Sequence, residues 1–248
     1  MTHNLEKLIR SLHSRHGRKK HKLCLCEGVR ACGELLAHRP DLVKHAVKTD
    51  DCVLPAEFDA VDFITVPQEK MKQLSPTVTP QGVLFTVKRP ETEYQEQFES
   101  PYALVLDGVS DPGNMGTIIR TARAAGLSEI FLTSGCADPF SDKVIRSALA
   151  SQFALQIFRF ANLGEAVREL RGAGCKNFWK TDPHGGVPLF EEPELFTDAA
   201  IIIGGEASGV SAHPECRPVT IPMPGKSESL NAAQAATIFM FEAVRRKT

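Results

Sequence analysis

The feature that most constrains the fold is a series of short, almost uninterrupted apolar runs in the second half of the chain. Examples are residues 102–106, 130–133 and 201–203. Runs without polar alternation are typical of strands covered on both faces, as in parallel sheets. Segments with helical spacing of apolar residues, such as 117–125 and 163–171, lie between strands. The alternation predicts an α/β domain with helices on both faces of a parallel sheet.

The first ninety residues predict a second, smaller α/β domain. Helices are expected over residues 5–12, 29–36 and 67–74, strands over 23–28, 43–47, 61–66 and 82–87, and a basic turn over 13–22. A charged segment with a proline near each end follows and is the best candidate for a linker. We therefore expect a substrate-binding domain over 1–92, a linker over 93–100 and a second domain over 101–248.

Positive charge is concentrated near the start of the chain, although the formal net charge of the whole protein is −1. A basic block on an otherwise neutral protein favours contact with phosphate, and here with RNA. The residues assigned to this contact are Arg15, Arg18, Lys19, Lys20 and Lys22. A solvated, partly frayed N-terminus is the alternative interpretation.

The seven cysteines form no CxxC pair, which indicates reduced thiols and a cytoplasmic protein without a metal site. Cys24 and Cys26 would share one face of a strand, and this suits burial. No apolar run reaches the length of a membrane span, so we expect no membrane association.

A turn-rich segment, residues 111–116, precedes the helix expected over 117–125 and could cradle a phosphate. The chain lacks both GxGxxG and GxxxxGK[ST], which argues against an NAD-dependent enzyme or an NTPase. Arg120 has small or apolar neighbours in that helix, so we expect it to be half-buried beside an anionic or RNA partner. A surface salt bridge is the alternative.

Three short turns lie close together near the C-terminus, at residues 204–209, 222–225 and 229–231. The first follows a buried strand and exposes one carboxylate, Glu206. Turns with few large side chains allow a flat ligand to lie against the main chain. An ordinary strand–turn–strand–helix ending of an α/β domain would also give this pattern.

Taken with Asn114-x-Gly116-x-x-x-Arg120, these segments resemble the three motifs of the SpoU (TrmH-like) RNA 2′-O-ribose methyltransferases, part of the SPOUT superfamily. The second motif is Gly204-x-Glu206-x-x-Gly209, and the third runs from Ile221 to Asn231. The resemblance covers residues 102–246. It implies a deep trefoil knot, S-adenosylmethionine as methyl donor and a homodimer. Residues 1–90 resemble, more weakly, the small RNA-binding domain of some members.

The resemblance also implies roles for single residues. Gly204, Ile221 and Leu230 match positions that hold the adenosine of the donor, and Thr133, Gly135 and Met223 are assigned to the same site. Arg120 matches the arginine proposed to help remove the 2′-hydroxyl proton. The residues that orient this arginine and the target nucleotide would be Asn114, Glu206, Ser229 and Asn231. Because the pKa of arginine is far above neutral, Arg120 either removes the proton in a desolvated site or only binds phosphate.

The leading hypothesis is a methyltransferase acting on the ribose 2′-hydroxyl of structured RNA, with ribosomal RNA favoured over tRNA. The alternatives are a tRNA 2′-O-methyltransferase and a non-catalytic RNA-binding or ribosome-assembly protein on the same scaffold. A homodimer has separate support, because the segment after Asn231 is apolar on almost every helical face up to Arg245. Such a helix must be covered on all sides, either by a partner subunit or inside a monomer.

Overall fold

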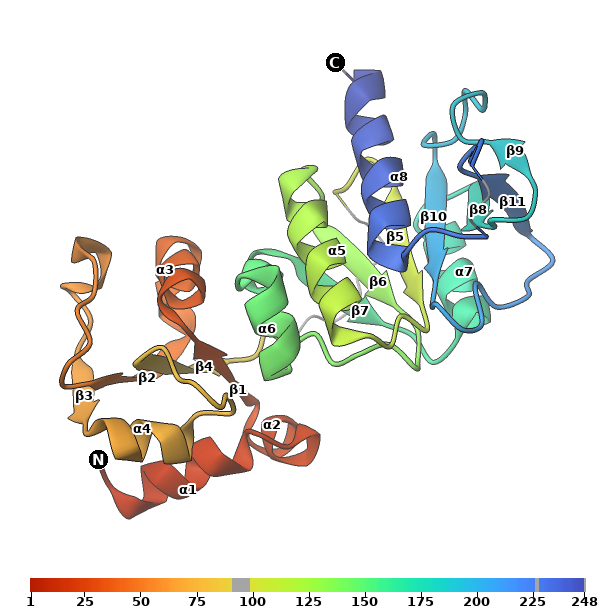
Figure 1. Cartoon of the computed structure of the whole chain (residues 1–248). Helices are drawn as coiled ribbons and strands as arrows, with labels where there is room; N and C mark the ends of the chain where they lie inside the picture. Colours follow the sequence, from red (N-terminus) through yellow and green to blue (C-terminus); the bar gives the residue numbers. More distant parts are fainter. Residues whose placement is uncertain (91–98, 226–227, 248) are drawn as a thin grey trace. The chain divides into compact units, whose positions relative to one another are not determined.

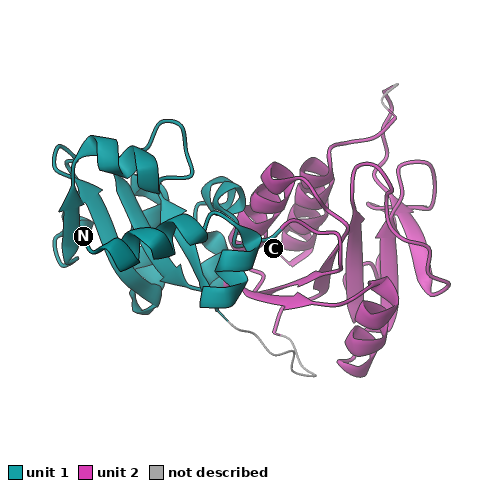
Figure 2. Ribbon diagram, turned by 90° about the horizontal axis from the view of Figure 1, so that it is seen from below, with its two compact units in different colours: residues 1–91, 138–154 teal, residues 92–137, 155–248 magenta. Residues whose placement is uncertain are grey.

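The computed structural model describes residues 1–90, 99–225 and 228–247. The chain forms two compact units, residues 1–91 with 138–154, and residues 92–137 with 155–248 (Figure 2). The sequence predicts an uninterrupted second domain over 101–248, whereas residues 138–154 pack with the first unit. Most of the expected linker, residues 93–98, lies outside the described residues.

The first unit is built on a four-stranded mixed sheet in the order β1-β4-β2-β3 (Figure 1). Its strands are β1 (Leu23–Glu27), β2 (Val43–Thr49), β3 (Phe63–Val66) and β4 (Val83–Lys88). Its helices are α1 (His3–Ser11), α2 (Arg15–His21), α3 (Val29–His38), α4 (Gln68–Leu74) and α6 (Asp142–Ala148), with 3-10 turns η1 (Pro40–Leu42), η2 (Ala56–Phe58) and η3 (Ser151–Ala154). Only β2 and β3 run parallel.

Helices α1 and α4 share one hydrophobic cluster with this sheet. Leu5 and Ile9 of α1 and Met71 of α4 are buried in it beside Val47 of β2 and Leu84 of β4. Their spacing on α1 is the one that predicts a helix over residues 5–12, and that prediction is confirmed. The small α/β domain expected from the sequence therefore has its own core.

The prediction of a basic turn over residues 13–22 is wrong, because Arg15–His21 form helix α2. Ser14 caps its start, where its hydroxyl accepts a hydrogen bond from the Gly17 amide at 3.0 Å. Gly17 is required there, since a Cβ would lie 1.9 Å from the carbonyl oxygen of Ser11. Lys22 ends the helix in the left-handed conformation.

The second unit contains a seven-stranded sheet in which every neighbouring pair is parallel. The strand order is β7-β6-β5-β10-β8-β11-β9. The strands are β5 (Ala103–Asp107), β6 (Glu129–Leu132), β7 (Gln156–Arg159), β8 (Asn177–Thr181), β9 (Val187–Pro188), β10 (Ala199–Gly204) and β11 (Cys216–Thr220). The predicted parallel α/β domain is confirmed, and the short edge strand β9 is an addition to it.

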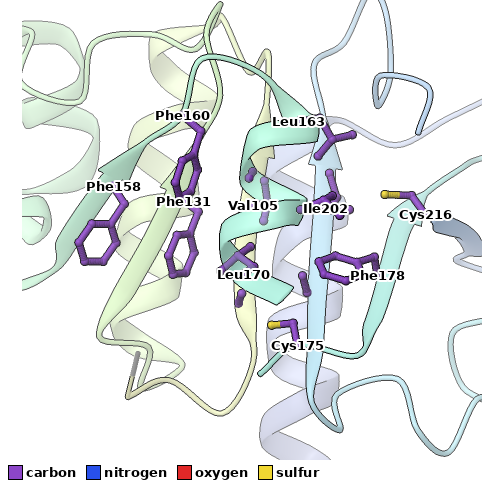
Figure 3. Close-up of a cluster of buried hydrophobic side chains, with 14 residues drawn as sticks. Val105, Phe131, Phe158, Phe160, Leu163, Leu170, Cys175, Phe178, Ile202 and Cys216 are labelled. Atoms are coloured by element: carbon purple, nitrogen blue, oxygen red, sulfur yellow. The ribbon is translucent and has the colours of Figure 1, made fainter. Parts of the chain in front are cut away.

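Helices cover both faces of this sheet. Helix α7 (Leu163–Gly172) packs on one face, where Leu163 and Leu170 meet Phe131, Phe178 and Ile202 (Figure 3). Helices α5 (Pro112–Ala124) and α8 (Ala232–Lys247) lie side by side on the other face (Figure 1). None of the described helices is long and apolar enough to cross a membrane.

Helix α5 begins five residues earlier than the sequence predicts. Asp111 is its N-cap, with Oδ1 accepting the Asn114 amide at 2.8 Å, and Pro112 occupies the first turn. An Asp cap followed by proline is a strong start signal for a helix. Asn114 consequently lies in the first turn of a helix and not in the loop expected over 111–116.

Candidate functional site

A cavity of about 460 Å³ lies in the second unit, at the carboxyl ends of β8, β10 and β11. This edge of a parallel sheet is where α/β proteins usually bind ligands. Residues 180–184, 203–210 and 228–230 line it, together with Val219 of β11, with Ile221 and Met223 after that strand, and with Ala232, Ala235 and Phe239 of α8. The cavity therefore gathers all three turns that the sequence singles out near the C-terminus.

Glycine main chain forms one wall of the cavity. A Cβ on Gly204 would lie 2.2 Å from the carbonyl carbon of Gly209, and a Cβ on Gly205 would lie 2.3 Å from the Gly108 oxygen. Both contacts are far below the closest approach of real side chains, so neither position admits a larger residue. The loop is tied by the Gly209 amide donating to the Gly205 oxygen at 2.9 Å.

Three predicted site residues form one line of hydrogen bonds beside this wall. The Asn231 amide nitrogen donates to Asn114 Oδ1 at 2.9 Å, and the Asn114 amide nitrogen donates to Glu206 Oε1. Asn231 Oδ1 also accepts the Ala233 amide at 2.9 Å and so caps α8. These bonds fix which way each amide points. Side chains more than ninety residues apart in sequence thus meet at one place.

Ser229 and Arg120 are placed differently. Ser229 lines the cavity. Arg120 does not line it and is exposed on α5, and its guanidinium makes no hydrogen bond or ion pair with the described residues. It lies about 9 Å along the helix from Asn114 and about 120° around it, by ideal helix geometry. The expectation of a half-buried Arg120 is wrong for this chain, because Ile118, Ile119 and Ala122 on α5 pack inward and leave the arginine exposed.

The residues assigned to the methyl donor fall into two groups. Gly204, Ile221, Met223 and Leu230 line the cavity. Thr133 and Gly135 do not line it. Thr133 is buried, and its hydroxyl donates to Asp107 Oδ1 at 2.6 Å. Gly135 forms a turn with a φ of +88°, which favours glycine.

Several cavity residues were not found from the sequence. Lys180, Asp182 and His184 line it where the chain leaves β8. The Asp182 carboxylate accepts the His184 amide at 2.9 Å and so shapes this turn. The signal available was position alone, since Lys180 lies near the end of β8, and Asp182 and His184 follow it, at the ligand-binding edge of the sheet.

The basic surface of the first unit holds four of the five residues predicted to contact RNA. Arg15, Lys19, Lys20 and Lys22 are exposed. The prediction that Arg18 contacts RNA is wrong, because Arg18 is only 5% exposed and its guanidinium pairs with Asp138 Oδ2 at 2.9 Å. A guanidinium buried in an internal ion pair is unavailable to phosphate.

No group of three or more His, Cys, Asp or Glu side chains in the described residues is arranged to hold a metal ion. Cys24 and Cys26 are buried, as their strand pattern predicts. Burial raises the pKa of the Cys216 thiol to about 11 and also raises the pKa of Cys136. Thiols of this kind are neutral near pH 7 and unsuited to nucleophilic catalysis.

Known proteins resemble both units. The SpoU rRNA Methylase family matches residues 101–241, and the MRM3-like substrate binding domain matches residues 6–84. A Bacillus subtilis protein, 23S rRNA (guanosine(2553)-2′-O)-methyltransferase RlmP, is 33% identical over 94% of this chain and 92% of its own length.

Solved structures resemble the whole chain as well. A putative RNA methyltransferase of the TrmH family from Porphyromonas gingivalis is 32% identical, with a TM-score of 0.83 over 99% of both chains. The SpoU methyltransferase AviRb from Streptomyces viridochromogenes, solved with the cofactor AdoMet, is 27% identical, with a TM-score of 0.84 over 100% of this chain and 98% of that one. The family match alone spans more than half of the chain, and this protein belongs to the SpoU rRNA methylase family.

Proposed function

We propose that this protein transfers a methyl group from S-adenosylmethionine to a ribose 2′-hydroxyl of ribosomal RNA. The observation that carries the proposal is the hydrogen-bonded line of Asn231, Asn114 and Glu206 beside a glycine-walled cavity. The proposal draws on the names of the relatives, among them the 23S rRNA 2′-O-methyltransferase RlmP of Bacillus subtilis.

The cavity suits a nucleoside-containing donor in size and lining. Its volume of about 460 Å³ is within the range of small-molecule sites. Ile221, Met223 and Leu230 offer apolar contact for a flat base, and the main chain at Gly204 and Gly205 forms part of the wall. The sulfonium of the donor carries an already activated methyl group, so the protein's task is to align the hydroxyl with it.

We further propose that the protein acts as a homodimer that uses α5 and α8. Phe241 on α8 is 47% exposed, and Arg120 on α5 is exposed and lies outside the cavity. A second subunit would cover the apolar residue and would bring its own Arg120 toward the cavity of the first. Arg120 would then either accept the hydroxyl proton or hold a phosphate of the target nucleotide.

The first unit is proposed to bind RNA through α2. Arg15, Lys19 and Lys20 are exposed within a single short helix, and Lys22 is exposed at its end. Neighbouring cations of this kind bind phosphate without sequence preference.

The deep trefoil knot implied by the family is also a proposal, and the close passage of Gly205 against Gly108 supports it.

The test of activity is transfer of labelled methyl from S-adenosylmethionine to cellular RNA, followed by mapping of 2′-O-methyl sites. Label in ribosomal RNA is expected from the wild-type protein. It should be lost in Asn114→Ala and in Asn231→Asp, which keeps an acceptor for the cap of α8 but removes the donor to Asn114. Label only in tRNA would show that the protein is a tRNA 2′-O-methyltransferase. RNA binding without donor binding would show that it is a non-catalytic RNA-binding protein.

A mixing experiment tests whether Arg120 acts across a dimer. Arg120→Ala and Asn114→Ala are each expected to be inactive alone. If the arginine serves the partner's cavity, each mixed dimer has one complete site, and random mixing restores about a quarter of the wild-type activity. No recovery in a mixture shown to contain mixed dimers would place Arg120 in the same subunit's site. A monomeric mass in solution would refute the dimer.

A further inference from the structure

We infer that Asp107 is a positioning residue that holds the cavity loop, residues 204–211, in the shape that receives the methyl donor. Asp107 does not line the cavity and belongs to no group assigned above. It ends strand β5, and its side chain is buried, with 5% of the residue exposed. The inference rests on the proposed function, because it names what sets the affinity of that same site.

Asp107 contacts both ends of the loop. At the start, its carbonyl oxygen accepts the Gly205 amide at 2.9 Å, next to the strand pairing of Gly204 with Asp107. At the end, its carboxylate Oδ2 accepts the Ser211 amide at 2.7 Å. One residue therefore closes the loop that contributes seven consecutive lining residues, 204–210, to the cavity.

The orientation of the carboxylate is fixed by the neighbouring strand. Oδ1 accepts the Thr133 hydroxyl at 2.6 Å, and the same hydroxyl accepts the Gly108 amide at 3.2 Å. Thr133 directly follows β6, so Asp107 connects the ends of β5 and β6 with the loop after β10. This accounts for a role of Thr133 in the site without contact with the cavity, because it acts through Asp107.

A side chain with two acceptor oxygens is well suited to this position, because one oxygen accepts the Ser211 amide and the other accepts the Thr133 hydroxyl. A loop held in its ligand-binding shape before the ligand arrives loses less entropy on binding. Glu206 lies in the middle of the loop and bonds to Asn114, so an unanchored loop would also loosen the line of polar residues.

The sequence offers variants that separate positioning from general stability. Asp107→Ala removes the carboxylate and frees the end of the loop. Asp107→Asn keeps both contacts if its oxygen faces Ser211 and its amide faces Thr133, whose hydroxyl can then donate to the Ser134 carbonyl, already 3.2 Å away. Glu129→Ala is the matched control, because Glu129 is also a buried carboxylate but begins β6, at the other end of the sheet from the cavity.

The test is titration calorimetry with S-adenosylhomocysteine, combined with hydrogen exchange of the ligand-free protein. Asp107→Ala should weaken binding on the order of tenfold or more, whereas Asp107→Asn should remain within about threefold of wild type. Glu129→Ala should lower the melting temperature and leave affinity unchanged. Equal affinities of wild type and Asp107→Ala, or equal losses in Asp107→Ala and Glu129→Ala, would overturn the inference.

Hydrogen exchange distinguishes failure of this inference from failure of the proposed function. Faster exchange over residues 204–211 in Asp107→Ala, but not in Glu129→Ala, supports the positioning role even if the wild-type protein binds no S-adenosylhomocysteine. In that case the proposed donor is wrong, but the positioning role of Asp107 is supported. Unchanged hydrogen exchange over residues 204–211 in Asp107→Ala would refute the positioning role of Asp107.

Discussion

Replacing Arg18 by alanine should destabilise the first unit, whereas replacing its neighbour Lys19 should not. Arg18 Nε and Nη2 donate to Asp138 Oδ2 at 3.1 and 2.9 Å, and Nη1 donates to the carbonyl oxygens of Leu12 and His13 at 3.1 and 3.0 Å. The two charged side chains are only 6% and 8% exposed. Lys19, one residue later on α2, is exposed.

The expected loss of stability in Arg18→Ala depends on the buried Asp138 carboxylate, which loses its partner. Removing one partner of a buried ion pair costs about 3–5 kcal/mol, because the other charge stays buried without compensation. Arg89 Nη2 lies 4.0 Å from Asp138 Oδ1, and the Phe140 amide donates to the same oxygen at 3.2 Å. These contacts offset part of the loss, so we expect about 3 kcal/mol for Arg18→Ala. Lys19→Ala should stay within about 0.5 kcal/mol of wild type.

The pH dependence of the free energy of unfolding is a second test of the Arg18–Asp138 ion pair. Burial raises the pKa of Asp138, but the hydrogen bonds from Arg18 and the charges of Arg89 and Arg18 outweigh it, so the net pKa is lowered from 3.8. A carboxyl with a lowered pKa in the folded state stabilises the fold above its unfolded pKa and loses this contribution as pH falls. Arg18→Ala should therefore lose stability mainly above about pH 4 and approach the wild type in more acidic solution.

Urea unfolding measured by circular dichroism checks these values, with hydrogen exchange over α2 and β1 as the local readout. Trp179 is in the second unit, so its fluorescence reports the other half of the chain. A loss below about 1 kcal/mol in Arg18→Ala would refute the reasoning, as would an equal loss in Lys19→Ala. RNA binding offers the reverse contrast, since Lys19→Ala should reduce the salt dependence of affinity.

Three further predictions concern the second unit. Hydrogen bonds from Arg245 and Arg246 hold the pKa of Glu242 at about 2 against its burial, so thermal stability should fall as pH drops from 4.5 toward 2, and less so in Glu242→Gln. Gly205→Ala should abolish donor binding, because its Cβ would lie 2.3 Å from a main-chain oxygen, whereas Gly225→Ala, with nothing within 4 Å, should bind normally in calorimetry. Asp111→Ala should cost about 1 kcal/mol in urea unfolding through the lost cap of α5.

The sequence predicts the parts of this fold that are set by local pattern. The continuous apolar run at residues 102–106 forms strand β5, which is flanked by strands on both sides, and the spacing of Leu5 and Ile9 correctly predicts α1. The predicted turn and loop are wrong at the two places where a side chain caps a helix in a segment whose composition favours a turn. Gly17 and the surrounding charges favour a turn in sequence, but Ser14 caps a helix there. The turn-rich composition of residues 111–116 favours a loop, but Asp111 caps α5 and Pro112 lies in its first turn.

Charge pattern alone could not separate Arg18 from its neighbours. The partner that buries it, Asp138, is 120 residues away in the sequence. The same distance explains the difference in domain division, because the segment 138–154 covers β1 of the first unit although it lies between β6 and β7 of the second. Non-local pairing of this kind leaves no trace in local spacing.

The candidate site is determined by strand register more than by any single motif. β5 and β10 are neighbours in parallel, with Asp107 opposite Gly204. Glu206 lies two residues after the end of β10, and Asn114 lies in the first turn of α5, which follows β5. Both residues therefore lie beyond the carboxyl edge of the sheet. A shift of this register by one residue would turn the side chains of β10 to the opposite face and carry Glu206 away from Asn114. The close approach of Gly205 to Gly108, the residue after β5, opposes the shift that would bring Glu206 to this point, because a Cβ there would lie 2.3 Å from the Gly108 oxygen. Gly205, which lines the cavity, thus also favours the register that brings Glu206 to Asn114.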